Sequence, residues 1–186
     1  MNGNMTPKPP YKKTPHPAKE CAYIAVFVAL LIALQLALTA VPGVEAVTVL
    51  FVSYAYVFGW KRGMAAATAF SLLRQMVFGF YPVVLILYLL YYNGMAALFG
   101  TMGKRTASLL QSVAVVTVLA CVCTVGFTLL DNVLTPLFYG FSRKAAKAYF
   151  LASLPFMLPQ ILCAGLTVGF LFVPIASAFQ RIKRAL

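Results

Sequence analysis

The chain has 186 residues, of which 62% are hydrophobic and only 10% are charged, and this composition excludes an ordinary soluble domain. Lys and Arg number 15 against three acids, which gives a net charge of +12. Because the basic residues cluster at the ends of apolar runs, they indicate membrane orientation and contact with anionic headgroups, not nucleic-acid binding.

The hydropathy pattern predicts an all-α integral membrane protein, a compact bundle of six transmembrane helices. The predicted spans are residues 21–40, 46–60, 63–80, 82–100, 107–130 and 149–179. Residues 1–20 are rich in Pro and Lys and are predicted to be a disordered basic cytoplasmic tail, and residues 21–182 form one membrane domain. A signal peptide is the competing interpretation of the first apolar run, but this run is longer than the usual apolar core of about 7–15 residues.

Basic residues alternate between the polar gaps of this map and predict its orientation. Eleven of them fall on one face: Lys8, Lys12, Lys13, Lys19, Lys61, Arg62, Lys104, Arg105, Arg181, Lys183 and Arg184. The positive-inside rule makes that face cytoplasmic, so both termini are predicted to lie inside. The gaps at 41–45 and 80–82 carry no Lys or Arg, whereas a long external loop predicted at 131–148 carries three and breaks the pattern.

Alanines recur every four residues along the first span, at Ala25, Ala29, Ala33 and Ala37. Small residues at this period form a helix face that another helix can approach closely. Packing within the chain and docking of a partner protein explain this face equally well, and the sequence leaves both interpretations open.

The last predicted span is long and rich in proline. Pro155, Pro159 and Pro174 lie within it and are expected to kink or break the helix. No internal repeat is visible in the chain, so the inverted-repeat design of many secondary transporters is not supported.

Arg74 lies within the third predicted span, roughly two-thirds of the way to the outer face. A charge within a membrane costs roughly 3 kcal/mol or more, so it needs a partner. Glu45 and Asp131 are the acids on its side, while Glu20 lies at the inner start of the first span. We therefore expect Glu45 or Asp131 to neutralise Arg74, either as a stabilising ion pair or within a site for an anionic or carbonyl-bearing ligand.

Other polar and aromatic side chains map to the same outer half of the bilayer. The predicted substrate-binding residues are Glu45, Arg74, Tyr88, Tyr92, Asn93, Asp131, Asn132 and Gln160. Gln35, near the outer end of the first span, and Tyr91 belong to the same group. An aromatic-walled cavity with few fixed polar groups is the usual design of a small-molecule site, although packing or an interfacial position explains each tyrosine alone.

Catalytic and metal chemistry find little support in the chain. His16 is the single histidine and lies in the tail, so no Ser/His/Asp or Cys/His set can form. The four cysteines lack metal-ligand spacing and are interpreted as small apolar side chains. We predict no catalytic residue, no metal and no cofactor, and no P-loop sequence is present, so active transport must take its energy from elsewhere.

The six-span layout, the alanine face and the first external loop together resemble the S components of energy-coupling factor transporters. These are small membrane proteins that capture vitamins or related micronutrients. The segment 42–63 (PGVEAVTVLFVSYAYVFGWKRG) resembles the proline–glutamate–threonine loop and the following aromatic span of a subgroup without an assigned substrate. The resemblance covers most of residues 20–182.

This resemblance implies a substrate-binding subunit of the bacterial cytoplasmic membrane, with a membrane T component and two cytoplasmic ATPases as partners. Ala25, Ala29 and Ala33 would dock on the T component, and the ligand would lie near the outer side, contacted by spans four to six. Transport would proceed by toppling of the whole subunit in the bilayer. No thiamine, riboflavin or biotin signature is recognised, so the substrate stays open.

Two other classes of function stay open. A structural membrane scaffold of the bacterial cell-shape type is similarly small, and it predicts a morphology defect without an uptake defect, but it leaves the outer polar group unexplained. A small membrane enzyme acting on lipid or peptide would use Glu45 and Asp131 as a carboxylate pair, and its activity would be lost in Asp131→Asn and Glu45→Gln.

Overall fold

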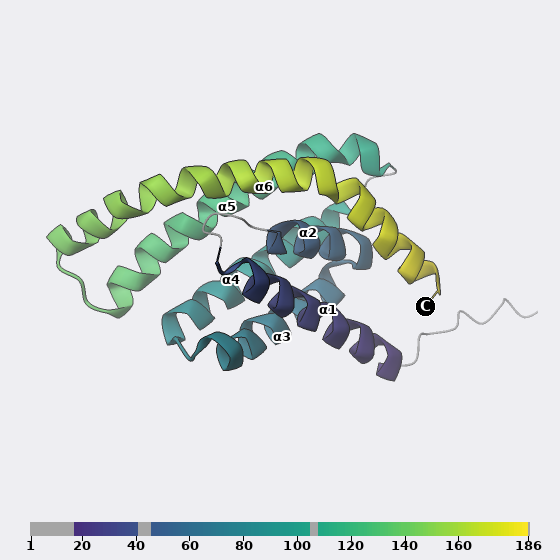
Figure 1. Ribbon diagram of the computed structural model, residues 1–186, viewed down its shortest axis with the longest axis horizontal. Helices are drawn as coiled ribbons and strands as arrows, with labels where there is room; N and C mark the ends of the chain where they lie inside the picture. The colour runs from purple at the N-terminus through teal and green to yellow at the C-terminus, as the bar shows by residue number, and fades with distance from the viewer. Residues whose placement is uncertain (1–16, 41–45, 105–107, 186) are drawn as a thin grey trace, which may run out of the picture.

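The computed structural model describes residues 17–40, 46–104 and 108–185, and none of these residues lies in a strand. Its helices are α1 (Pro17–Leu38), α2 (Val47–Phe58), α3 (Trp60–Phe78), α4 (Pro82–Met102), α5 (Leu109–Phe138) and α6 (Arg143–Ala185) (Figure 1). Four of them, α1, α4, α5 and α6, are long and apolar enough to cross a membrane. The prediction of an all-α membrane protein is thereby confirmed, whereas six full spans and the placement of the termini stay predictions.

The outward faces of the long helices are apolar. Val26 on α1, Leu110 on α5 and Phe170 on α6 are exposed over 70%, 76% and 77% of their surfaces. In water such contiguous apolar surface would drive aggregation, whereas lipid tails solvate it at no cost. The exposed faces therefore have the composition expected of surfaces in contact with lipid.

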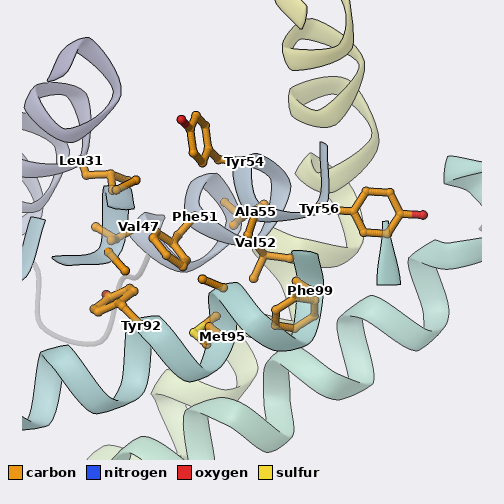
Figure 2. Packing of buried hydrophobic residues seen from close by; sticks show 14 of the residues in the cluster. Leu31, Val47, Phe51, Val52, Tyr54, Ala55, Tyr56, Tyr92, Met95 and Phe99 are labelled. Carbon is orange, nitrogen blue, oxygen red and sulfur yellow. The ribbon is translucent and has the colours of Figure 1, made fainter. Parts of the chain in front are cut away.

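Helix α2 is the centre of the bundle and is buried on nearly all sides. It packs against α6, α4, α3 and α1. A helix that is apolar all round is stable only when other helices surround it, and α2 has no charged residue. Figure 2 shows its side chains Phe51 and Val52 pointing toward α4, where Tyr92, Met95 and Phe99 meet them. With 12 residues α2 is about 18 Å long, which is short for a hydrocarbon core of about 30 Å.

Successive helices alternate in direction, so their ends gather at two ends of the bundle. At one end, which we call the basic end, Arg62 at the start of α3 forms an ion pair with Glu20 at the start of α1. Lys183 near the end of α6 donates a hydrogen bond to the carbonyl oxygen of Val57 at the end of α2. The first turn of α1 and the last turn of α6 accordingly lie at the same end (Figure 1).

Glycines allow very close helix approach at the basic end. Gly59 joins α2 to α3 with a φ of +88°, a conformation that favours glycine. Gly100 of α4 packs directly on the backbone of this turn. A Cβ atom at Gly100 would lie 2.3 Å from the backbone nitrogen and 2.5 Å from the Cα of Trp60. The tight junction of α2, α3 and α4 therefore depends on the absence of a side chain at Gly100.

The predicted loop at 131–148 is wrong, because helix occupies most of it. Helix α5 continues to Phe138 and α6 begins at Arg143, which leaves residues 139–142 as the connection. The polar residues that suggested a loop, Asp131 and Asn132, form side-chain hydrogen bonds to neighbouring helical residues and so do not interrupt the helix.

Helix α6 is continuous over its three prolines, so of the two expected outcomes, a kink or a break, the break does not occur. Figure 1 shows α6 bending in its yellow C-terminal part. At 30 and 43 residues, α5 and α6 are about 45 and 65 Å long, well over the thickness of a hydrocarbon core. Their hairpin therefore extends beyond α1–α4 at the end opposite the basic end (Figure 1).

Candidate functional site

A cleft of about 400 Å³ lies between α3, α4, α5 and α6 at the end of the bundle opposite the basic end. Its walls are Arg74, Tyr81, Val83, Val84, Leu87, Tyr88, Phe127, Asp131, Thr135, Tyr139 and Tyr149. A second hollow of about 330 Å³ lies between α5 and α6 and shares Phe127, Asp131 and Tyr149 with the first. Asp131 thus stands where the two hollows meet, and the first, which we call the Arg74 cleft, holds both an acid and a base.

Arg74 is held in the cleft by hydrogen bonding and by stacking. Its Nε donates to Oε1 of Gln35 at 3.2 Å, and Nε2 of Gln35 donates to the hydroxyl oxygen of Tyr88 at 3.0 Å. The guanidinium carbon lies 4.3 Å from the ring centroid of Tyr88 and 4.8 Å from that of Phe78. Cation–π contacts of this kind stabilise a guanidinium that has left water.

The same guanidinium has an unused donor. Nη1 of Arg74 is buried and has no hydrogen-bond partner among the residues that the structure describes. A buried donor without an acceptor costs about 1–3 kcal/mol, and more when the group is charged. Arg74 therefore borders the cleft with a charged group that has donor capacity left over.

The expected ion pair between Arg74 and Asp131 is not formed. Over residues 17–40, 46–104 and 108–185 the only ion pair joins Arg62 and Glu20. Glu45, the other expected partner and a predicted site residue, lies outside the described residues. The rings of Tyr88 and Phe78 and the amide of Gln35, not a carboxylate, are the described groups that stabilise Arg74.

Asp131 is held by two hydroxyl groups. Thr135, one turn later on α5, donates to Oδ1 at 2.7 Å, and Tyr149 of α6 donates to Oδ2 at 2.7 Å. Hydrogen bonds to a carboxylate are among the stronger ones, so they fix the side chain where it lines both hollows. Each oxygen keeps further acceptor capacity for a donor on a ligand.

Only part of the predicted site comes together around the cleft. Tyr88 lines it with Arg74 and Asp131, whereas Tyr92 is 6% exposed and its ring packs on Phe51 and Phe70 in the core. The structure therefore places Tyr92 among the packing residues of the bundle.

Asn93 lies apart from the cleft, between α3 and α4. Its Nδ2 donates to the carbonyl oxygen of Leu89 at 2.8 Å, and its Oδ1 accepts a long 3.5 Å hydrogen bond from the hydroxyl of Thr68. The contact with Thr68 joins α4 to α3, and Asn93 is not one of the residues that line either hollow.

Asn132 and Gln160 belong to the α5–α6 hairpin. Nδ2 of Asn132 donates to the hydroxyl of Ser153 at 2.8 Å and ties the two helices together, while its buried Oδ1 has no partner among the described residues. Gln160 lines the second hollow. The predicted polar group is thus divided between the Arg74 cleft, the neighbouring hollow and two helix contacts.

The sequence prediction missed Thr135, Tyr139 and Tyr149, which line the cleft. Thr135 follows Asp131 by four residues, a spacing that would have placed both on one face of a helix had the segment been predicted as helical. Tyr149 was assigned to the start of a span, and nothing local indicates that its hydroxyl reaches Asp131.

The alanine face of α1 points away from the rest of the chain. Ala25, Ala29 and Ala33 are exposed, while α1 packs inward through Phe27, Val28 and Leu31. Packing within the described part of the chain therefore does not use the alanine face, which leaves it open to lipid or to another protein.

Comparisons with protein-family models, with curated proteins and with solved structures find no match to this chain. The described residues contain no group of three or more His, Cys, Asp or Glu side chains that could hold a metal ion. What the cleft does contain is a stacked arginine, a hydroxyl-bound carboxylate and several aromatic walls, which are groups suited to binding a small polar molecule.

Proposed function

We propose that this chain is a membrane-embedded substrate-capture subunit for the uptake of a vitamin or related micronutrient. In this proposal it works as an S component of an energy-coupling factor transporter, and separate ATPase subunits supply the energy. The observation that carries the proposal is the guanidinium of Arg74, which is fixed in an aromatic cleft with the buried donor Nη1 left without a partner among the described residues.

A purely structural arginine would be expected to satisfy its donors within the chain, because an unpaired charged donor inside a membrane is costly. Arg74 uses Nε internally and is stacked between two rings, yet Nη1 points at no described acceptor. A ligand carboxylate, phosphate or carbonyl would supply the acceptor, and loss of this cost on binding would add to affinity. This is what supports a binding function over a scaffold.

A capture subunit of this kind has a defined orientation in the membrane and defined partners. Six helices would cross the bacterial cytoplasmic membrane with both termini in the cytoplasm, since the basic end carries Arg62, Lys104 and Lys183. The Arg74 cleft would then open toward the outside. A membrane T component would dock on the exposed alanine face of α1, and two cytoplasmic ATPases would act through it.

The test is ligand binding by the purified chain in detergent, first by native mass spectrometry for a co-purifying metabolite and then by titration against vitamins and nucleobases. We expect saturable binding that is lost in Arg74→Ala. Arg143→Ala is the matched control, because Arg143 is an exposed arginine that does not line the cleft. If no compound binds and the chain instead brings down cell-wall synthesis proteins, the scaffold hypothesis replaces this one.

A further inference from the structure

Two opposite charges line the Arg74 cleft without forming an ion pair. Arg74 comes from α3 and Asp131 from α5, and both side chains border the same 400 Å³ space. An arginine and a carboxylate that border one cleft attract each other, and a flexible pair would close to contact. That they stay apart calls for a physical reason.

The reason is that each charged side chain is held in place by its own set of contacts. Arg74 is stacked on Tyr88 and Phe78 and bonded to Gln35, so its plane is fixed against α1 and α4. Asp131 is held on the other side by the hydroxyls of Thr135 and Tyr149. Neither set of contacts includes the other charged side chain, so the packing of the helices keeps Arg74 and Asp131 apart.

A ligand with a single charge would satisfy only one of these groups. A ligand with only a negative charge would be attracted by Arg74 but repelled by Asp131. A ligand with only a positive charge would be attracted by Asp131 but repelled by Arg74. Resting on the proposed function, we infer that the captured molecule is a zwitterion, whose anionic group binds Arg74 and whose cationic group binds Asp131.

The walls and size of the cleft match such a ligand. Tyr81, Phe127 and Tyr139 provide apolar surface for its body, and tyrosine faces also attract an ammonium group. At about 400 Å³ the space lies at the small end of the range of about 300–1,000 Å³ for ligand pockets. An amino-acid-like molecule that carries a carboxylate and an ammonium on a compact skeleton fits these limits.

The experiment uses matched sets of probes on the full-length chain in nanodiscs. One set is phenylalanine, 3-phenylpropionate and phenethylamine, and the other is leucine, 4-methylpentanoate and 3-methylbutylamine. Within each set the skeleton is constant, while the first member is a zwitterion, the second an anion and the third a cation. Affinity is measured by titration, and the vitamin and nucleobase panel is measured on the same preparation.

We expect the zwitterion to bind about 10- to 100-fold more tightly than either singly charged member, the range expected for one hydrogen-bonded charge. Asp131→Asn should remove its advantage over the anion, and Arg74→Gln its advantage over the cation. Glu20→Gln, which removes a carboxylate at the basic end, is the control and should leave the order unchanged. Fluorescence of Trp60 checks that each variant is folded.

Equal binding of zwitterion and anion, with no effect of Asp131→Asn, would overturn the inference and leave the capture function standing. Tight binding of a panel compound with a single charge, or none, would overturn it in the same way. No binding by any probe or panel compound would remove the capture function itself, and the inference with it.

Discussion

Gly100→Ala is a substitution whose effect the packing of the helices defines clearly. The added Cβ would lie 2.3 Å from the backbone nitrogen of Trp60, and contacts under 3.0 Å are not tolerated. The obstructing atoms belong to the backbone at the start of α3, so no side chain can rotate away and the helices themselves must separate. Overpacking of this kind costs about 1–3 kcal/mol.

Gly94 provides the matched control on the same helix. A Cβ at Gly94 meets nothing within 4 Å, so Gly94→Ala adds the same methyl group without a clash. Alanine is favoured over glycine in a helix interior by roughly 0.5–1 kcal/mol, so this variant should be neutral or more stable. The difference between the two variants isolates the close approach of α4 to the turn between α2 and α3.

The assay is thermal unfolding in detergent, followed by the emission of Trp60, which is the only tryptophan in the chain and borders the clash. For a chain of this size about 1 kcal/mol corresponds to roughly 2–4 °C in Tm, so Gly100→Ala should unfold about 2–12 °C below the wild-type protein. Its folded-state emission should also shift, whereas that of Gly94→Ala should not. Equal Tm values for the two alanine variants would refute the packing described for this junction.

Three further predictions concern charged side chains. Arg74→Lys should weaken ligand binding about tenfold or more in a titration, because lysine lacks the planar guanidinium that can stack on rings and donate hydrogen bonds at once. Binding as tight as that of the wild type would contradict the role given to Nη1. Tyr149→Phe removes one of the two hydroxyl groups that donate to Asp131, and it should lower the free energy of unfolding by about 1–2 kcal/mol. Thermal unfolding measures this change, and an unchanged Tm would show that the hydrogen bond contributes nothing to stability. Burial lowers the pKa of Lys183 from its ordinary value of 10.5, and the charge of Arg62 lowers it further. The folded protein therefore binds this proton less tightly than the unfolded chain does. As a result, the free energy of unfolding should rise as the pH approaches 10.5. Melting curves across the alkaline range should show a smaller rise for Lys183→Gln than for the wild type, and identical slopes would refute this assignment.

The sequence predicted the helices well where the signal is local. The apolar runs predicted at 46–60, 63–80 and 82–100 begin and end within a few residues of α2, α3 and α4 in the structure. The prediction of a loop at 131–148 is wrong because polar residues do not by themselves end a helix. In the structure Asp131 and Asn132 lie within α5, where Thr135 and Ser153 form hydrogen bonds with their side chains.

The candidate site was predicted in outline only. Arg74 was recognised because a charge within an apolar span is unusual whatever surrounds it, and the structure places it in the cleft with Tyr88 and Asp131. Its contact with Gln35 joins two helices and is not encoded in local spacing, whereas Phe78 follows Arg74 by four residues and lies on the same face of α3. The placement of Tyr92 in the core and of Asn93 between helices depends in the same way on which face of α4 meets α3.

Composition and hydropathy by themselves determined that this is a helical membrane protein, because apolar runs of sufficient length favour lipid over water regardless of the rest of the fold. The alternation of basic residues predicted which helix ends lie together. Only the tertiary structure decided that Arg74 and Asp131 share a cleft without pairing, because that depends on the separate contacts that hold each charge. Those contacts come from helices far apart in the chain, and their geometry exists only once α1, α3, α4, α5 and α6 are packed.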